Sequence, residues 1–183
     1  MIPFIFIFGF VLITVMMTVF VYNKLITLKN RMKEAWSGID VFLKKRHDLT
    51  PNLVAAVKGY ATHERATFEE INRYRSIALQ AKDRDERITS ESGLGNAIGQ
   101  LMAVAENYPE LKANVNFLEL QKRLSELEEE LSRARRYYNG TVRENNIYVE
   151  RFPSNIIAGM FNFDKGTFFE ITSNEKAVPN VSF

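Results

Sequence analysis

The chain of 183 residues contains no cysteine, only two histidines, five prolines and nine glycines. Without cysteine, a disulfide framework, a thiolate metal site and a cysteine nucleophile are all excluded. The 24 basic residues nearly balance the 22 acidic ones. A dedicated nucleic-acid-binding protein normally carries a strong basic excess, so no nucleic-acid partner is expected. A hydrophobic content of 46% is too high for a disordered chain, and the scarcity of proline and glycine permits long helices.

The first segment, Ile2 to Tyr22, has no charged residue. As a helix it would be about 31 Å long, close to the roughly 30 Å hydrocarbon core of a bilayer. A cleaved secretory signal fits less well, because no Lys or Arg precedes the run and no small-x-small cleavage site follows it. We therefore predict a transmembrane anchor, residues 1–22, with span ends at Ile2 and Tyr22.

Basic residues follow this run before the first acidic residue, Glu34; they are Lys24, Lys29, Arg31 and Lys33. Basic flanks stay on the cytoplasmic side of a membrane. The sequence thus predicts a single-pass protein of the inner (plasma) membrane, with its N-terminus outside and the remaining chain in the cytoplasm. The lipid bilayer is the first expected partner.

An apolar stripe at helical spacing runs on from the anchor without Gly or Pro between Gly9 and Gly38. It predicts one continuous helix from about residue 4 to about residue 49, weakest at Ser37-Gly38. Arg46 occupies one slot of this stripe. Thr50-Pro51 has the pattern of an N-cap followed by proline, so a second helix is expected from there to about Lys82; a Pro-kinked continuation is the alternative.

The rest of the chain also has helical periodicity. The polar, charged stretch 83–92 is expected to be a loop, and a short third helix should cover about 92–107. A heptad pattern from Phe117 to Phe152 predicts a long fourth helix that Pro153 ends. The fold class is therefore all-α: a transmembrane helix continuous with the first helix of an antiparallel four-helix bundle, residues 23–160, followed by an aromatic C-terminal tail, residues 161–183.

The sequence contains no complete catalytic or metal-binding motif. His63-Glu64 resembles part of a zinc-protease motif, but the second His would have to be at position 67, which is Thr. A site made from His47, His63 and a carboxylate such as Asp48 or Glu64 is the minority interpretation. We predict no catalytic residue, no metal site, no cofactor and no small-molecule substrate, and keep an undetected enzyme as an alternative.

Four phenylalanines stand close together in the tail: Phe161, Phe163, Phe168 and Phe169. Each would gain about 1.5–3 kcal/mol from burial. We interpret them as contacts with the bundle, a neighbouring subunit or another partner. Membrane contact is disfavoured in this interpretation, because the bundle should hold them away from the bilayer.

Several segments carry a family resemblance: residues 35–41 (AWSGIDV), 45–54 (KRHDLTPNLV), 108–113 (YPELKA) and 134–139 (ARRYYN). With further short matches, they cover most of the chain and resemble the LemA family of bacterial membrane proteins. The resemblance implies a four-helix bundle and no established activity. A magnetosome-forming relative implies membrane shaping, and family genes that neighbour membrane-protease genes imply a protease partner.

The sequence thus favours a non-enzymatic membrane scaffold that associates with itself as a homo-oligomer. In this hypothesis, a stiff helix fixes the angle between the bundle and the bilayer. The alternative is an adaptor for a membrane protease or another membrane partner.

Overall fold

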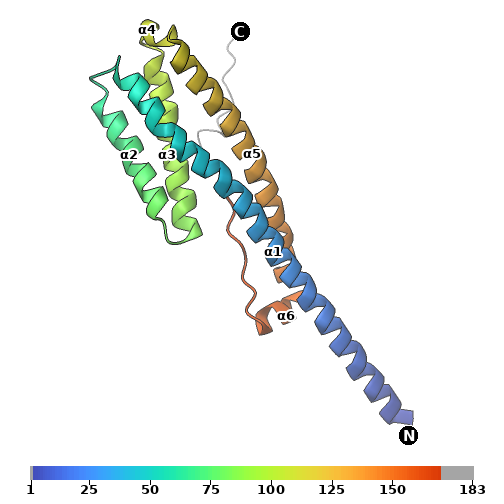
Figure 1. Ribbon diagram of the computed structural model, residues 1–183. Coiled ribbons are helices and arrows are strands. Elements are labelled where there is room, and N and C mark those ends of the chain that lie inside the picture. Colours follow the sequence, from blue (N-terminus) through green and yellow to red (C-terminus); the bar gives the residue numbers. More distant parts are fainter. Residues whose placement is uncertain (1, 170–183) are drawn as a thin grey trace, which may run out of the picture. The chain divides into compact units, whose positions relative to one another are not determined.

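The computed structural model describes residues 2–169, and within that range every regular element is a helix. The all-α class is therefore confirmed. The helices, labelled in Figure 1, are α1 (Ile2–Lys58), α2 (Arg65–Gln80), α3 (Arg84–Ala105), α4 (Pro109–Lys112), α5 (Val115–Glu150) and α6 (Ser154–Met160). Most of the predicted tail domain, from residue 170 onward, lies outside the described residues.

The chain divides into two compact units, and the long helices α1 and α5 contribute to both. Unit 1 combines the chain up to Gly38 with Ala134–Phe168. Unit 2 contains Ile39–Arg133 together with Phe169. The boundary in α1 falls at Gly38, where the sequence predicts the weakest point of the helix.

Helix α1 runs without a break from Ile2 to Lys58. The prediction of one helix through Tyr22 and the following stripe is confirmed, since Leu25, Leu28 and Ile39 are all buried. The predicted end near residue 49 is wrong, because Pro51 lies inside the helix rather than at the start of a new one.

The helix tolerates Pro51 because other groups complete its hydrogen bonding. Proline has no N–H to donate to the carbonyl oxygen of residue 47, four positions earlier. The Nε–H of Arg75, on α2, donates to that His47 oxygen at 3.0 Å. The Thr50 hydroxyl donates to the Arg46 oxygen at 2.6 Å. A side chain from another helix therefore replaces the missing backbone donor.

The first break in the folded part comes at residues 59–64, between α1 and α2. The predicted loop at 83–92 is wrong, since α3 begins at Arg84. Asp83 is its N-cap and accepts from the Glu86 N–H at 2.8 Å, while the Glu86 carboxylate accepts from the Lys82 N–H at 3.1 Å. This arrangement is close to a capping box, in which acidic side chains accept from the free backbone N–H groups at the start of a helix. The acidic residues of this stretch therefore favour a helix start rather than a loop.

Unit 2 has one apolar core to which α1, α2, α3, α4 and α5 all contribute. Helices α2 and α3 lie side by side (Figure 1). Their approach depends on Gly93, because a Cβ there would overlap the ring of Tyr74. The core residues include Leu53, Val57, Phe68, Ile71, Leu94, Ile98, Leu101, Leu111, Phe117 and Leu124. The antiparallel four-helix bundle stays a prediction.

Unit 1 is held together by aromatic and amide side chains of α5. Tyr138 packs edge-to-face on Trp36 of α1, with ring centroids 5.3 Å apart, and its hydroxyl donates to the Thr167 oxygen at 2.8 Å. Asn146 makes two hydrogen bonds with Gly166, one as donor to its oxygen and one as acceptor from its N–H. These contacts fix the chain beyond α6 against α5.

The heptad prediction fails at its last position. Helix α5 ends at Glu150, a cis peptide bond joins Phe152 to Pro153, and the Phe152 side chain is 74% exposed. Phe152 therefore faces away from the unit rather than into it.

The role of Arg75 at Pro51 is testable by a double-mutant cycle. Arg75→Met leaves the His47 carbonyl without its donor, and we expect a loss of about 1–3 kcal/mol in unfolding free energy. In a Pro51→Ala background the new Ala N–H can donate to the same carbonyl, so the loss should be smaller. Thermal unfolding followed by circular dichroism measures all four proteins. Equal losses in both backgrounds would contradict this account of Pro51.

Candidate functional site

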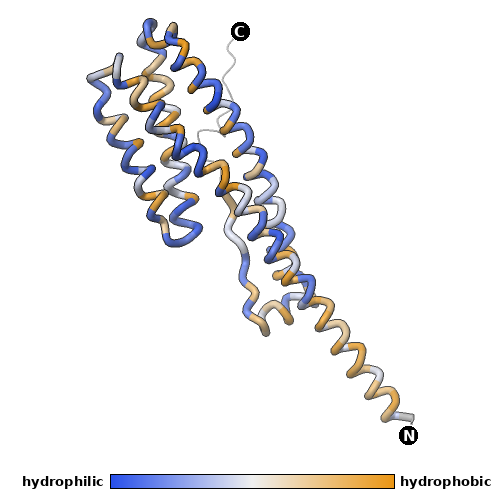
Figure 2. Tube along the Cα trace, viewed as in Figure 1, coloured by the Kyte–Doolittle hydropathy of each residue, from blue (hydrophilic) through white to orange (hydrophobic). Residues whose placement is uncertain are grey.

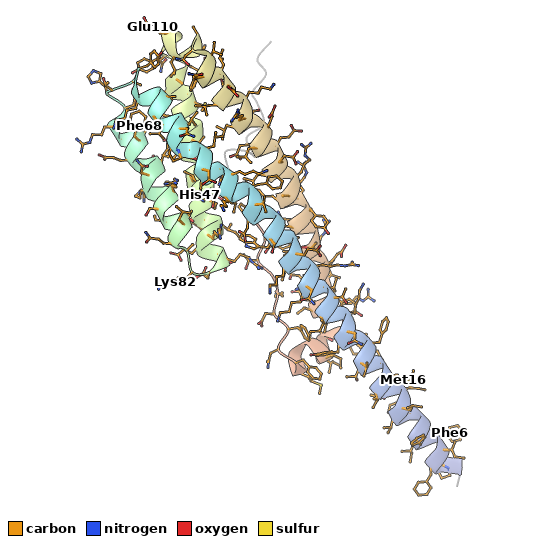
Figure 3. All side chains as sticks on the ribbon, viewed as in Figure 1. Phe6, Met16, His47, Phe68, Lys82 and Glu110 are labelled. Atoms are coloured by element: carbon orange, nitrogen blue, oxygen red, sulfur yellow. The ribbon has the colours of Figure 1, made fainter. Side chains whose placement is uncertain are left out.

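The N-terminal part of α1 is one candidate functional surface. Its apolar side chains from Phe4 to Phe20 are almost all exposed, and Figure 3 shows Phe6 and Met16 projecting from the helix. By length and composition, this is one helix that could cross a membrane. The hydroxyls of Thr14 and Thr18 donate to the carbonyl oxygens of Phe10 and Thr14, each at 2.9 Å. Its polar side chains therefore need no water, as a lipid environment requires.

The part of α1 that is exposed on all sides ends at Val21. Phe20 is 71% exposed, whereas Val21 is 5% exposed. Val21 and Leu25 form a buried cluster with Ala158 of α6 and with Phe163. Helix α6 therefore packs on α1 at the C-terminal end of the apolar run, and Figure 2 shows both segments coloured as hydrophobic there.

A sharp turn after α6 directs the following aromatic residues onto α1. Asn162 has a positive φ of 54°. The Phe163 N–H donates to the Ala158 oxygen at 2.9 Å, and the Asn162 N–H lies 3.5 Å from the Gly159 oxygen. This is the Schellman pattern, in which Asn replaces the more usual Gly in the left-handed position.

The turn brings two tail phenylalanines to Tyr22. The Tyr22 ring centroid lies 4.9 Å from that of Phe161 and 5.6 Å from that of Phe163, both edge-to-face. Phe163 and Phe169 are buried, whereas Phe161 and Phe168 are 48% and 40% exposed. Phe161 and Phe163 therefore pack within the chain, on the last residue of the apolar run. The expectation that the bundle holds them away from a bilayer stays a prediction. The exposed pair stay candidates for partner contact.

The basic residues after the run lie on the same part of α1. Lys24 is half-buried, whereas Lys29, Arg31 and Lys33 are exposed. The Lys29 ammonium lies 5.8 Å from the centroid of the Phe163 ring. Tyr22 therefore marks a change from apolar exposed surface to an aromatic and basic one. Ile2, the other predicted span end, is the first residue of α1.

Unit 2 contains a buried ionic cluster that sequence analysis missed. Arg46 and Glu91 are fully buried and form an ion pair, and the same Arg46 amino group donates to the Glu91 backbone oxygen at 2.9 Å. The other Arg46 amino group pairs with Glu128 at 3.2 Å. His47, also buried, donates from Nε2 to Glu91 at 2.7 Å. Gly95 leaves room for the guanidinium, which lies 3.4 Å from the position of an added Cβ.

The ion pairs decide the charge state of Glu91. Burial by itself would raise the pKa of this carboxyl, but the hydrogen bond from His47 and the charge of Arg46 outweigh it, so the net pKa lies below the ordinary value. Burial likewise disfavours the charged Arg46, yet Glu128 and Glu91 raise its pKa above the ordinary value. Both groups therefore stay charged at neutral pH.

This cluster has the character of a structural core. Arg46, His47 and Glu91 are almost completely buried, and the Glu91 carboxylate bonds both of the other side chains. Across residues 2–169, no three His, Asp or Glu side chains gather in a way that could hold a metal ion. His63 is exposed in the loop before α2, so the structure does not join it with His47. Asp40, a further carboxylate of α1, pairs with Arg87 at 3.3 Å.

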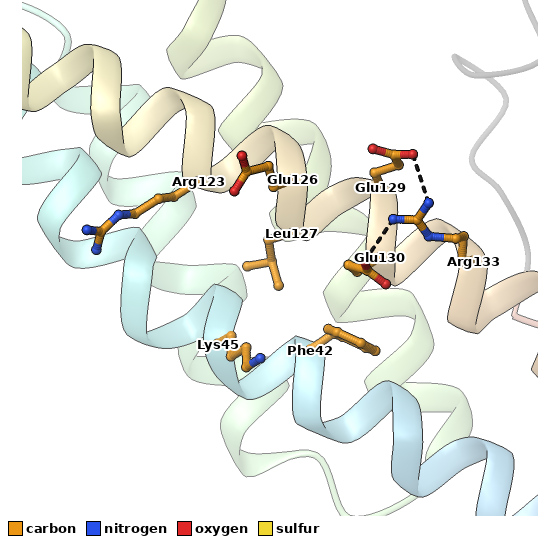
Figure 4. A pocket seen from close by; sticks show the side chains of 8 residues that line it. All are labelled: Phe42, Lys45, Arg123, Glu126, Leu127, Glu129, Glu130 and Arg133. Atoms are coloured by element: carbon orange, nitrogen blue, oxygen red, sulfur yellow. Dashed lines mark hydrogen bonds and ion pairs between the residues drawn. The ribbon is translucent and has the colours of Figure 1, made fainter.

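An open groove of about 420 Å³ lies between residues of α1 and α5 in unit 2 (Figure 4). Its charges largely neutralise one another. Arg133 pairs with Glu129 at 3.0 Å and with Glu130 at 2.7 Å. Lys45 lies beside Phe42, with its ammonium 5.5 Å from the ring centroid. Such a surface of local ion pairs offers no concentrated charge for a substrate.

Comparison with known proteins places the chain in a family. The model of the LemA family matches residues 35–183, so the chain belongs to the LemA family. Two relatives are "Magnetosome protein MamQ 2" of Paramagnetospirillum magneticum, 23% identical, and "Magnetosome protein MamQ" of Magnetospirillum gryphiswaldense, 21% identical. Each alignment covers 81% of this chain and 64% of the relative. "Protein LemA" of Metamycoplasma hominis is 27% identical over 91% of this chain and 78% of its own.

The ionic cluster predicts a defined acid sensitivity. A depressed pKa in the folded state means that Glu91 stabilises the fold fully above its unfolded pKa, about 4.3, and progressively less as pH falls below that value. Glu91→Gln should remove this part of the acid dependence. It should also lower the unfolding free energy at pH 7 by about 3–5 kcal/mol, because Arg46 loses its buried counter-charge. Unfolding measured from pH 3 to pH 7 tests both effects.

Glu126→Gln provides the matched control. Glu126 is an exposed residue of α5 whose ion pair with Lys122 spans 3.9 Å, so its loss should cost less than about 1 kcal/mol. An equal loss in the two variants would contradict the structural role assigned to Glu91.

Proposed function

We propose that this protein is a single-pass membrane-anchored scaffold that associates with copies of itself and organises or shapes the membrane. In this proposal, residues 2–22 cross the inner membrane with the N-terminus outside. The folded units then lie in the cytoplasm, on the side of Lys24, Lys29 and Arg31. The chain acts by holding its membrane contacts in a fixed geometry rather than by chemistry.

The observation that carries the proposal is the junction at Tyr22. Helix α1 continues through it without a break. At the same point α1 packs against α6 and Phe163, in the buried cluster of Val21, Leu25, Ala158 and Phe163. An ordinary tethered domain would have a flexible linker there. A helix packed on one side by α6 instead transmits the orientation of the span to unit 1.

Self-association is supported by apolar residues that unit 1 leaves exposed. Tyr137 and Ile147 on α5 are 63% and 52% exposed, and Phe168 is 40% exposed. Aromatic residues in such positions are common anchors of protein interfaces. Because every copy would carry the same fixed angle between span and unit, contacts between copies would impose a regular pattern or a curvature on the membrane.

The relatives agree with a role at a membrane without specifying it. The MamQ relatives are named as magnetosome proteins, and the chain spans 64% of their length. That likeness supports the organisation of a membrane surface for this chain as part of the proposal. Recruitment of a membrane protease is the alternative that the experiment below distinguishes.

A linker insertion tests the proposed stiffness. Seven residues rich in Gly and Ser, inserted between Phe20 and Val21, leave the cluster of unit 1 intact but free the span from it. We expect normal unfolding of the folded units and loss of ordered assemblies of the membrane-reconstituted protein. Electron microscopy of the reconstituted protein and mass measurement in detergent are the readouts.

A seven-residue alanine insertion at the same point is the matched control. Seven residues nearly restore the helical register, so the helix stays continuous and assembly should survive. Ordered assemblies in the Gly-Ser variant would refute the stiffness mechanism. A monomer that co-purifies with one other membrane protein would favour the adaptor function instead.

A further inference from the structure

We propose that α6 and its flanking residues form an interfacial foot: a second membrane-contact element that lies in the lipid headgroup layer beside the span. The foot consists of Phe152, Ile156, Met160 and Phe161. Its occupant is the lipid surface itself. This inference rests on the proposed membrane anchoring, since it requires the apolar run of α1 to be in a bilayer.

All four side chains of the foot are apolar and largely exposed. Phe152 is 74% exposed, Met160 68%, Ile156 53% and Phe161 48%. Ile156 and Met160 are four residues apart in α6 and therefore share one face of that helix. The opposite side packs on α1, where Ala158 is buried. Helix α6 therefore packs on α1 with one face and exposes apolar side chains on the other.

The position of α6 along α1 sets its depth. Residues 2–20 as a helix measure about 28 Å, slightly less than a hydrocarbon core of roughly 30 Å. The edge of the hydrocarbon therefore falls at Val21 or Tyr22. Helix α6 packs on residues 21–26 of α1, within about 6 Å of that edge. The headgroup layer extends about 5–8 Å beyond the hydrocarbon on each side, so α6 lies within it.

The chemistry of the surrounding residues suits this layer. Tyr22, Phe161 and Phe163 form an aromatic group, and aromatic rings concentrate at membrane interfaces. Lys29 and Arg151 are exposed nearby in the unit, and their charges favour anionic headgroups. Lys165 pairs with Glu150 at 2.7 Å, so the negative charge of Glu150 is compensated and does not repel anionic headgroups. Continuity with the apolar surface of α1 favours lipid over a protein partner.

Spin-label accessibility in vesicles tests the foot directly. The natural chain has no cysteine, so each single substitution gives one labelled site. We choose Met160→Cys in the foot, Leu12→Cys in the span, and Arg143→Cys on the exposed face of α5 in the same unit. The full-length protein is reconstituted in vesicles of phosphatidylcholine and phosphatidylglycerol. Collision of each label with oxygen and with a water-soluble nickel complex is then measured.

The expected ratio of oxygen to nickel accessibility at Met160→Cys is severalfold higher than at Arg143→Cys and lower than at Leu12→Cys. A ratio equal to that at Arg143→Cys, with Leu12→Cys in lipid, would overturn the foot and leave the anchoring intact. Exclusion of both reagents at Met160→Cys would also overturn it, because a protein surface would then cover α6. A water-like ratio at Leu12→Cys would refute the anchoring itself, and the foot with it.

Ile156→Cys repeats the measurement at an independent site. It guards against a local disturbance at Met160, since both side chains lie on the same face of α6. The foot is supported when the two labels report the same intermediate depth, and it is overturned when Ile156→Cys is as accessible to nickel as Arg143→Cys.

Discussion

At Val21, helix α1 changes from being exposed on all sides to being packed on one side, with no break in its backbone. The rest of unit 1 depends on this constraint. The backbone of α1 cannot bend there without losing hydrogen bonds. The residues that cover Val21 and Leu25 must therefore come from another segment of the chain. The end of α5, the short α6 and the turn at Asn162 provide that segment, and Phe163 completes it.

Unit 2 is specified differently, through buried charge. Arg46 takes a position in an apolar stripe where a hydrophobic side chain would be expected, and its cost of burial is offset by Glu91, Glu128 and a backbone oxygen. Such a group fits only one register of α1 against α3, because a shift by one turn would separate the charges. Apolar packing tolerates alternative alignments better, so the ionic cluster supplies specificity rather than stability alone.

The sequence predicted what periodicity and local composition control. The uninterrupted helix through Tyr22, the buried Leu25 and Leu28 and the all-α class follow from spacing alone. One error lies where a distant side chain decides the outcome. Thr50-Pro51 has every local sign of a helix start, but Arg75 supplies the missing donor and the helix continues.

The candidate sites show the same division. The apolar run is evident from composition, whereas Glu91 belongs to the polar stretch 83–92, for which the sequence predicts a loop. One signal was available: Ile88, Glu91 and Leu94 follow helical spacing, and Arg46 lacked a partner in its stripe. The placement of Phe161 and Phe163 beside Tyr22 had no such signal, because it depends on the turn at Asn162 and on the direction of α5.

The division of the chain between the two units also constrains the order of events during synthesis. Unit 2 is built almost wholly from the contiguous stretch Ile39–Arg133, so a ribosome delivers all its main helices in one piece. Unit 1 joins the earliest residues to Ala134–Phe168. The side of α1 that bears Val21 and Leu25 therefore stays uncovered in the nascent chain until translation has passed Phe163. Completion of unit 1 is consequently a late step of biogenesis, after the contiguous unit can fold.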